Sequence, residues 1–125
     1  MINKISSKSF IEDNLQKVSE ILIKYDPVKI VFYYNEKVEN PDEYDSEAKM
    51  LLKHIHMFGG IKNINKQILH NLLYSCFCHM FGNGISFQTG LYSRCSMKEL
   101  KKLIGKKESY KFAAKEIWEL LNRND

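Results

Sequence analysis

Apolar residues recur at helical spacing from the start of the chain. Between about Phe10 and Lys24 they lie three or four positions apart, which places them on one face of an α-helix. That face consists of Ile11, Leu15, Val18, Leu22 and Tyr25. Ser9 and Glu12 have the spacing of a capping box. The Asp26-Pro27 pair ends the helix, because the residue before a proline avoids the α conformation.

A second helix is predicted from Asn40 to the Gly59-Gly60 pair, which ends it. Asn40 suits the N-cap, and Pro41 suits the first helical position, where no backbone N–H is needed. The acidic residues of "NPDEYDSE" then lie in the first turn, near the positive end of the helix dipole. The apolar face behind them consists of Tyr44, Ala48, Leu51 or Leu52, and Ile55.

A third helix is predicted from about Asn65 to Phe81, with Gly82 closing it. Its apolar arc is broad, which indicates a central, mostly buried helix. The arc consists of Ile68, Leu69, Leu72, Leu73, Cys76, Phe77 and Met80. Residues 83–95 are punctuated by glycines and read as a long loop or a small hairpin.

Two shorter helices are predicted in the last third of the chain. Ser96 and Glu99 open the first as a capping box, and it runs through Ile104 to Gly105. Ser109 caps the second. The apolar residues of this last helix are Phe112, Ala113, Ile117, Trp118, Leu120 and Leu121.

The stretch "VKIVFYY", residues 28–34, is rich in β-branched and aromatic residues that alternate as in a strand. No second strand of similar strength is evident, and a lone strand cannot satisfy its backbone hydrogen bonds. We therefore expect an extended segment packed across helices, with a true strand as the alternative. The fold class predicted is all-α: a compact single-domain bundle of about five helices over residues 1–125, with at most one minor extended or hairpin element.

Composition and charge narrow the function only slightly. The 125 residues include 19 basic and 15 acidic side chains, and a net charge of +4 neither requires nucleic acid nor excludes it. No apolar run is long enough for a membrane span, and the N-terminus lacks a signal-peptide pattern. Three cysteines, an odd number, fit a reducing compartment. We expect a cytoplasmic protein, with no membrane contact, from a bacterium.

The carboxylates of the acidic stretch are a candidate cation site, because hard cations prefer oxygen ligands. These residues are Asp42, Glu43, Asp45 and Glu47. Their spacing is not that of a calcium-binding loop, and on a helix they point in different directions. The favoured interpretation is a solvated helix start, and the alternative is a patch that contacts a partner; no metal is expected.

The stretch "SCFCHMF" offers Cys76, Cys78 and His79 as candidate zinc ligands. Positions two apart on a helix face different ways, and nothing in the sequence brings Cys95 or His56 near to complete a set. Cys95 could also act as a nucleophile with one of the histidines, but no catalytic motif accompanies it. The cysteines are interpreted as core residues. We expect no catalytic residue, no cofactor and no enzyme, with a metalloprotein or enzyme kept as an alternative.

The C-terminal third is basic, and part of it shares a helical face that could contact phosphates. The cluster consists of Lys98, Lys101, Lys102, Lys106 and Lys107. Neighbouring glutamates dilute its charge. Nucleic-acid binding through these lysines is the second hypothesis.

Three segments together resemble a known family: "KYDPVKI", "PDEYDSEAKMLLKHI" and "CFCHMFG". They resemble the YugE-like family, small bacterial helical proteins classed as a domain of unknown function, over roughly residues 15–82. The most distinctive parts are Asp26-Pro27 and the motif Glu43-Tyr44-Asp45-x-Glu47. The resemblance implies an all-helical fold and supplies no activity. Physically, we expect Asp26 to accept backbone N–H bonds at the helix exit and Tyr44 to pack under the second helix.

The favoured functional hypothesis is a small protein-binding module that acts by occlusion. Its most concrete form is a bacterial immunity protein that neutralises a partner toxin, such as a nuclease domain. The net positive charge counts against this form, because inhibitors of nucleases are more often acidic. The binding face predicted combines acidic residues with aromatic anchors: Glu36, Glu39, Asp42, Glu43, Asp45, Glu47, Tyr33, Tyr34 and Tyr44.

Overall fold

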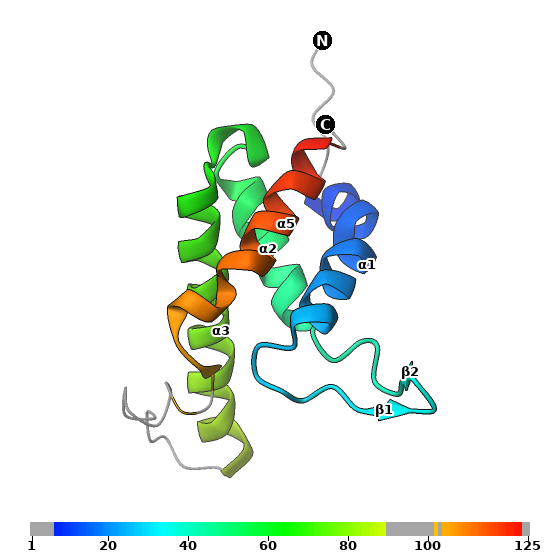
Figure 1. The fold of residues 1–125 in the computed structure, drawn as a ribbon. Helices are drawn as coiled ribbons and strands as arrows, with labels where there is room; N and C mark the ends of the chain where they lie inside the picture. The colour runs from blue at the N-terminus through cyan, green and yellow to red at the C-terminus, as the bar shows by residue number, and fades with distance from the viewer. Residues whose placement is uncertain (1–6, 90–101, 103, 124–125) are drawn as a thin grey trace.

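Four α-helices in the described part of the chain pack around one apolar core (Figure 1). The computed structural model describes residues 7–89, 102 and 104–123, and of residues 81–89 only the helical backbone. The helices are α1 (Ser7–Tyr25), α2 (Asp45–Met57), α3 (Lys66–Thr89) and α5 (Lys111–Arg123). Two 3-10 turns and a small hairpin complete the fold: η1 (Ile61–Asn63), η2 (Lys107–Tyr110), β1 (Tyr33–Tyr34) and β2 (Lys37–Val38).

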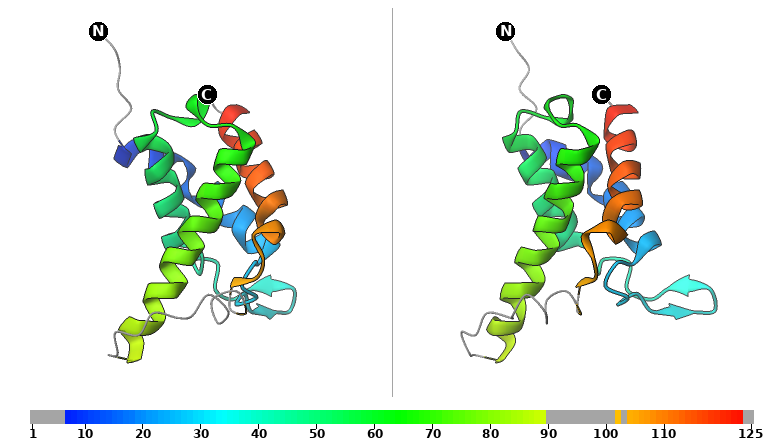
Figure 2. Two further views of the ribbon diagram at one scale, coloured as in Figure 1. Left: turned by 90° about the vertical axis from the view of Figure 1, so that its left-hand side faces the viewer. Right: turned by 60° about the vertical axis from the view of Figure 1, so that its left-hand side comes forward.

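The helices form two antiparallel pairs, α1 with α2 and α3 with α5 (Figure 2). The apolar faces of the two pairs meet in one core. In the first pair, the ring of Phe10 near the start of α1 contacts that of His56 near the end of α2. In the second, Tyr110 just before α5 contacts Phe77 of α3, while the Trp118 indole of α5 donates a 2.8 Å hydrogen bond to the Ile64 carbonyl before α3. The periodic faces predicted for these helices therefore supply the core, because each helix buries its apolar stripe against the others.

The prediction of five helices is only partly confirmed, because the described residues contain four. The helix predicted over residues 96–104 falls outside the described residues except for Lys102 and Ile104. The predicted end of the third helix at Gly82 is wrong, since α3 continues to Thr89 and includes residues 83–89 of the predicted loop. A single glycine costs a helix interior only about 1 kcal/mol relative to alanine. Residues 90–95 of that loop lie outside the described residues.

The end of α1 is a polar junction built on Asp26. The helix stops at Tyr25, as predicted, and Asp26 adopts a left-handed conformation with φ +42°. Its carboxylate accepts backbone N–H bonds from Ile30 (2.9 Å) and Val31 (3.3 Å). The buried Tyr44 hydroxyl donates to the same carboxylate over 2.6 Å and accepts the Val28 N–H over 3.3 Å. Both structural roles expected for Asp26 and Tyr44 are confirmed.

The start of α2 differs from the prediction. Residues 41–44 form turns, and the helix begins at Asp45 after Tyr44, which makes no side-chain cap. Asn40 is therefore not an N-cap, and Pro41 is not the first helical residue. The side-chain amide of Asn40 instead forms hydrogen bonds with the Phe32 N–H and the Ile30 carbonyl. The predicted end is confirmed: the Gly59 and Gly60 N–H groups donate to the His56 and Ile55 carbonyls, the pattern of a Schellman motif.

The two serine caps predicted for α1 and α5 are also wrong. Ser9 lies within α1, which already includes Ser7. Ser109 lies inside η2, and its hydroxyl donates a 2.6 Å bond to the Lys106 carbonyl instead of accepting a bond from a helix N–H. A serine three residues before a glutamate is a common combination, so its spacing alone does not locate a helix start.

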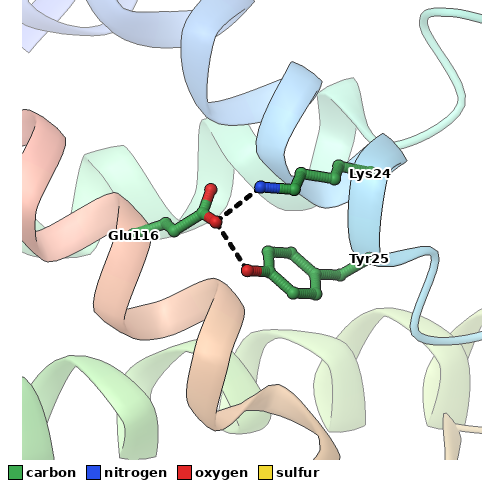
Figure 3. Close-up of polar contacts among 3 residues, drawn as sticks. All are labelled: Lys24, Tyr25 and Glu116. Carbon is green, nitrogen blue, oxygen red and sulfur yellow. Dashed lines mark hydrogen bonds and ion pairs between the residues drawn. The ribbon is translucent and has the colours of Figure 1, made fainter.

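A polar contact connects α5 to the end of α1 (Figure 3). The Glu116 carboxylate accepts a 2.7 Å bond from the Lys24 ammonium and a 2.6 Å bond from the Tyr25 hydroxyl. The hydrogen bond from Lys24 holds the pKa of Glu116 below its ordinary value. The last turn of α1 is therefore held from two sides, by Glu116 beside it and by Asp26 directly after it.

We expect Tyr44→Phe to lower the free energy of unfolding by about 1.5–3 kcal/mol, the usual range for a hydrogen bond to a charged group. The ring still fills its site, so the substitution removes only the two hydrogen bonds of the hydroxyl, the short bond to Asp26 and the longer bond from the Val28 N–H. Urea unfolding monitored by circular dichroism measures the change. Tyr34→Phe, at an exposed position, is the matched control. Equal stability of the two variants would show that the Asp26–Tyr44 bond contributes nothing.

Candidate functional site

The segment expected to be merely extended ends in a hairpin. Tyr33 pairs with Val38 and Tyr34 with Lys37 in antiparallel register, so Asn35 and Glu36 form a two-residue turn. Both turn residues have positive φ, +50° and +65°. This is the conformation that a two-residue turn needs to match the twist of its strands. The partner strand was missed because "EKV" carries no strand-like alternation.

Three consecutive aromatic side chains on this hairpin are exposed to solvent. Their exposed fractions are 68% for Phe32, 60% for Tyr33 and 66% for Tyr34. The hairpin projects from the helices at the end of the molecule where α1 stops (Figures 1 and 2). Neighbouring residues of a strand point to opposite faces, so aromatic rings occupy both faces of the hairpin. We call residues 32–39 the aromatic hairpin.

Hydrogen bonds from residues that flank the aromatic hairpin, and one between its own backbone groups, hold its base in place. The Asn40 amide accepts the Phe32 N–H over 2.8 Å and donates to the Ile30 carbonyl over 2.9 Å. The Glu39 N–H donates to the Phe32 carbonyl over 2.8 Å. The Asp26 carboxylate binds the chain just before these residues. The hairpin is therefore an ordered projection whose base is fixed by hydrogen bonds.

Unfavourable backbone conformations are concentrated in the same region. All non-glycine residues with positive φ in the described part of the chain lie between positions 26 and 36. They are Asp26, Lys29, Asn35 and Glu36. Such conformations persist only where the surroundings enforce them, and they cluster at functional sites. Their position supports assigning a function to this part of the molecule.

The predicted binding residues divide into exposed and buried groups. Tyr33, Tyr34 and four carboxylates are exposed: Glu36, Glu39, Asp42 and Glu43. Asp45 is half-buried and accepts a 2.7 Å bond from the Ser19 hydroxyl. Tyr44 and Glu47 are buried and do not belong to the surface, because both face the core from the start of α2.

Phe32 was missed, because the alternation of residues 28–34 groups it with the partly buried Val28 and Ile30.

An acidic groove adjoins the base of the aromatic hairpin. It has a volume of about 320 Å³ between α1 and the turn before α2. Its charged lining residues are all carboxylates: Glu12 and Glu20 from α1, with Asp42 and Asp45 from the other side. Pro41, which also lines it, directly follows the Asn40 that holds Phe32. The groove therefore comes nearest to the hairpin along the chain at Pro41 and Asp42, which directly follow Asn40.

The candidate metal and nucleophile residues are not assembled in the described part of the chain. Cys76 lines a cleft of about 180 Å³ between α2 and α3 together with His54, Ser75 and His79. No three cysteine, histidine or acidic residues among those described are placed to share an ion. Burial raises the pKa of the Cys76 thiol to about 12, so it is protonated at neutral pH. A protonated thiol is a poor nucleophile and metal ligand. Cys95 lies outside the described residues.

The basic cluster is only partly described. Lys102, Lys106 and Lys107 are exposed, whereas Lys98 and Lys101 lie outside the described residues. The helical face predicted to be shared by Lys98, Lys101 and Lys102 is therefore untested, and nucleic-acid binding stays a prediction. None of the helices in the described ranges combines the length and the apolar character needed to cross a membrane.

Comparison of the chain with models of known protein families, with curated proteins and with solved structures found no match. The resemblance to the YugE-like family therefore stays a prediction.

We expect Asn40→Ala to free the base of the aromatic hairpin. The substitution removes the two bonds to the backbone of residues 30 and 32, at a cost of about 1–2 kcal/mol of stability. Amide hydrogen exchange at Phe32 should accelerate accordingly. Glu39→Ala, next to it and with no side-chain hydrogen bond recorded, is the control. Unchanged exchange at Phe32 in Asn40→Ala would mean that the hairpin is held by other contacts.

Proposed function

We propose that the protein is a small protein-binding module and that the aromatic hairpin is its binding element. Its most concrete form is a bacterial immunity protein that acts in the cytoplasm and occludes the active site of a partner toxin. The observation that carries the proposal is the run of three exposed aromatic side chains on an ordered projection. Aromatic residues are the usual anchors of protein interfaces, because each buries a large area at a small cost in side-chain entropy.

The arrangement of the rings supports a concave partner surface. Tyr33 points to one face of the hairpin, whereas Phe32 and Tyr34 share the other. A flat partner covers only one of these faces. A partner that buries all three rings therefore has to surround the hairpin, as the walls of a cleft do. Enzyme active sites are commonly clefts, so insertion of the hairpin would block the access of substrate.

The distribution of charge supports a basic partner surface. Exposed carboxylates in and after the hairpin (Glu36, Glu39, Asp42 and Glu43) and the acidic groove gather negative charge in a chain whose net charge is +4, although Lys37 lies in the hairpin itself. Complementary charge accelerates association and selects among partners. A cleft that binds phosphates is basic, and a nuclease toxin has such a cleft. Inhibitors of nucleases are more often acidic, and local acidity at the binding element would meet this requirement in a chain whose net charge is positive.

A preformed hairpin also favours tight binding. Ordering a flexible loop on association consumes part of the binding free energy. Here the turn, the Asn40 amide and the Asp26 carboxylate order the hairpin before a partner arrives.

The proposal is tested with the product of the gene next to the one encoding this chain, if that product carries a toxin domain, by coexpression and calorimetry of the purified pair. We expect the double variant Tyr33→Ala, Tyr34→Ala to weaken binding at least 100-fold and to abolish protection against the toxin. Stability should stay within about 0.5 kcal/mol of the unsubstituted protein, because the removed rings are exposed.

Phe112→Ala is the matched control. Phe112 is also an exposed aromatic residue, at 64%, but it lies at the start of α5 rather than on the hairpin. Its removal should leave binding unchanged. A complex that tolerates loss of both tyrosines, or that is equally sensitive to Phe112→Ala, would refute the role of the aromatic hairpin.

A further inference from the structure

Glu47 is an acidic residue in a buried position, where an ionised side chain is energetically unfavourable. It lies in the first turn of α2, and only 6% of its surface is exposed. Its Oε2 atom is fully buried and has no hydrogen-bond partner in the structure. Buried polar groups in proteins are nearly always paired, so an unpaired carboxylate oxygen requires an explanation.

Among the described residues, no positively charged group contributes to the environment of Glu47. From α3, the group that acts on it is the Cys76 thiol, which is neutral and buried. From its own helix and the preceding turn, the groups that act on it are Asp45 and Glu43, which repel a negative charge. A hydrogen bond from its own backbone N–H favours the ionised form. Burial is the largest influence and outweighs that bond, so the pKa of Glu47 lies above its ordinary value of 4.5.

We propose that Glu47 takes up a proton on folding and makes the packing of α2 in the core proton-dependent, so that its own contribution to the stability of the domain is greater in acid than at neutral pH. The neutral acid removes the repulsion by Asp45 and Glu43 and the cost of burying a charge. Tyr44, one turn before Glu47, binds Asp26 at the base of the aromatic hairpin. Ionisation of Glu47 is therefore expected to weaken the packing of the first turn of α2, which directly follows Tyr44. This inference does not depend on the proposed function.

The direction of the pH dependence follows from the raised pKa. Below pH 4.5 the carboxyl is protonated in both the folded and the unfolded chain, and its contribution is complete. As the pH rises from 4.5 to the pKa in the folded state, the unfolded chain releases the proton first and stability is lost. One proton separates the two states in that window, so the unfolding constant increases about tenfold per pH unit. Glu116 acts in the opposite direction, since its pKa is lowered and its contribution is lost in acid.

Comparison of variants isolates Glu47 from Glu116 and the other titrating groups. Urea unfolding is measured between pH 3 and pH 8 for the unsubstituted protein, Glu47→Gln and the exposed control Glu39→Gln. We expect equal unfolding constants for Glu47→Gln and the unsubstituted protein in acid, and at least tenfold greater stability for Glu47→Gln at neutral pH. Glu39→Gln should follow the unsubstituted protein throughout. A difference that is the same at every pH, or that increases in acid, would overturn the proposal.

A measurement on the unsubstituted protein shows whether Glu47 takes up a proton on folding, even if Glu47→Gln fails to fold. The carboxyl carbon of Glu47 is followed by NMR through the same pH range. A titration midpoint above 4.5 is expected, and a midpoint at or below 4.5 would show that Glu47 is ionised in the core and that no proton is taken up on folding.

Discussion

The hydrogen bond between the Tyr44 hydroxyl and the Asp26 carboxylate is the contact on which the arrangement of the other elements depends. Asp26 directly follows α1 and Tyr44 directly precedes α2, so their hydrogen bond joins the two ends of the segment formed by residues 27–43. The same carboxylate binds the chain leaving α1. The tyrosine ring meanwhile lies fully buried and contacts Phe77 of α3. One pair of side chains thus connects the core, the pairing of α1 with α2, and the position of the hairpin.

The molecule separates stability from recognition. Most of the described large apolar residues of the helices are buried or half-buried, Met57 and Phe112 being exceptions, whereas Phe32, Tyr33 and Tyr34 are all exposed on a segment that adds little to the core. A domain organised this way can change its recognition surface without disturbing its packing. This is the usual division of labour between a rigid scaffold and the loops it presents. The acidic groove lies at the border of the two parts, where α1 meets the turn before α2.

The sequence predicted the helices well, and the ends of α1 and α2 correctly, but it misplaced three helix starts and the end of α3. Apolar periodicity located all four described helices, because burial of a continuous face needs a regular repeat. The starts of α1, α2 and α5 were misplaced. Ser9, Asn40 and Ser109 are residue types that commonly cap helices, but none of them caps the helix it was assigned to. The aromatic residues of the site were visible in the sequence, but their exposure was not, since Tyr44 and Tyr34 are chemically identical and only the fold buries one of them. Glu47 was assigned to the surface for the same reason.

The shortness of the two strands has a consequence for the protein in a crowded cell. A long, flat ribbon with exposed aromatic rings and free backbone groups invites pairing with other copies and growth into fibres. Here each strand has only two residues, and one of the four is Lys37, whose charge opposes such stacking. The left-handed turn twists the ribbon further from planarity. The hairpin can therefore expose three aromatic side chains while offering little strand edge for pairing with other copies.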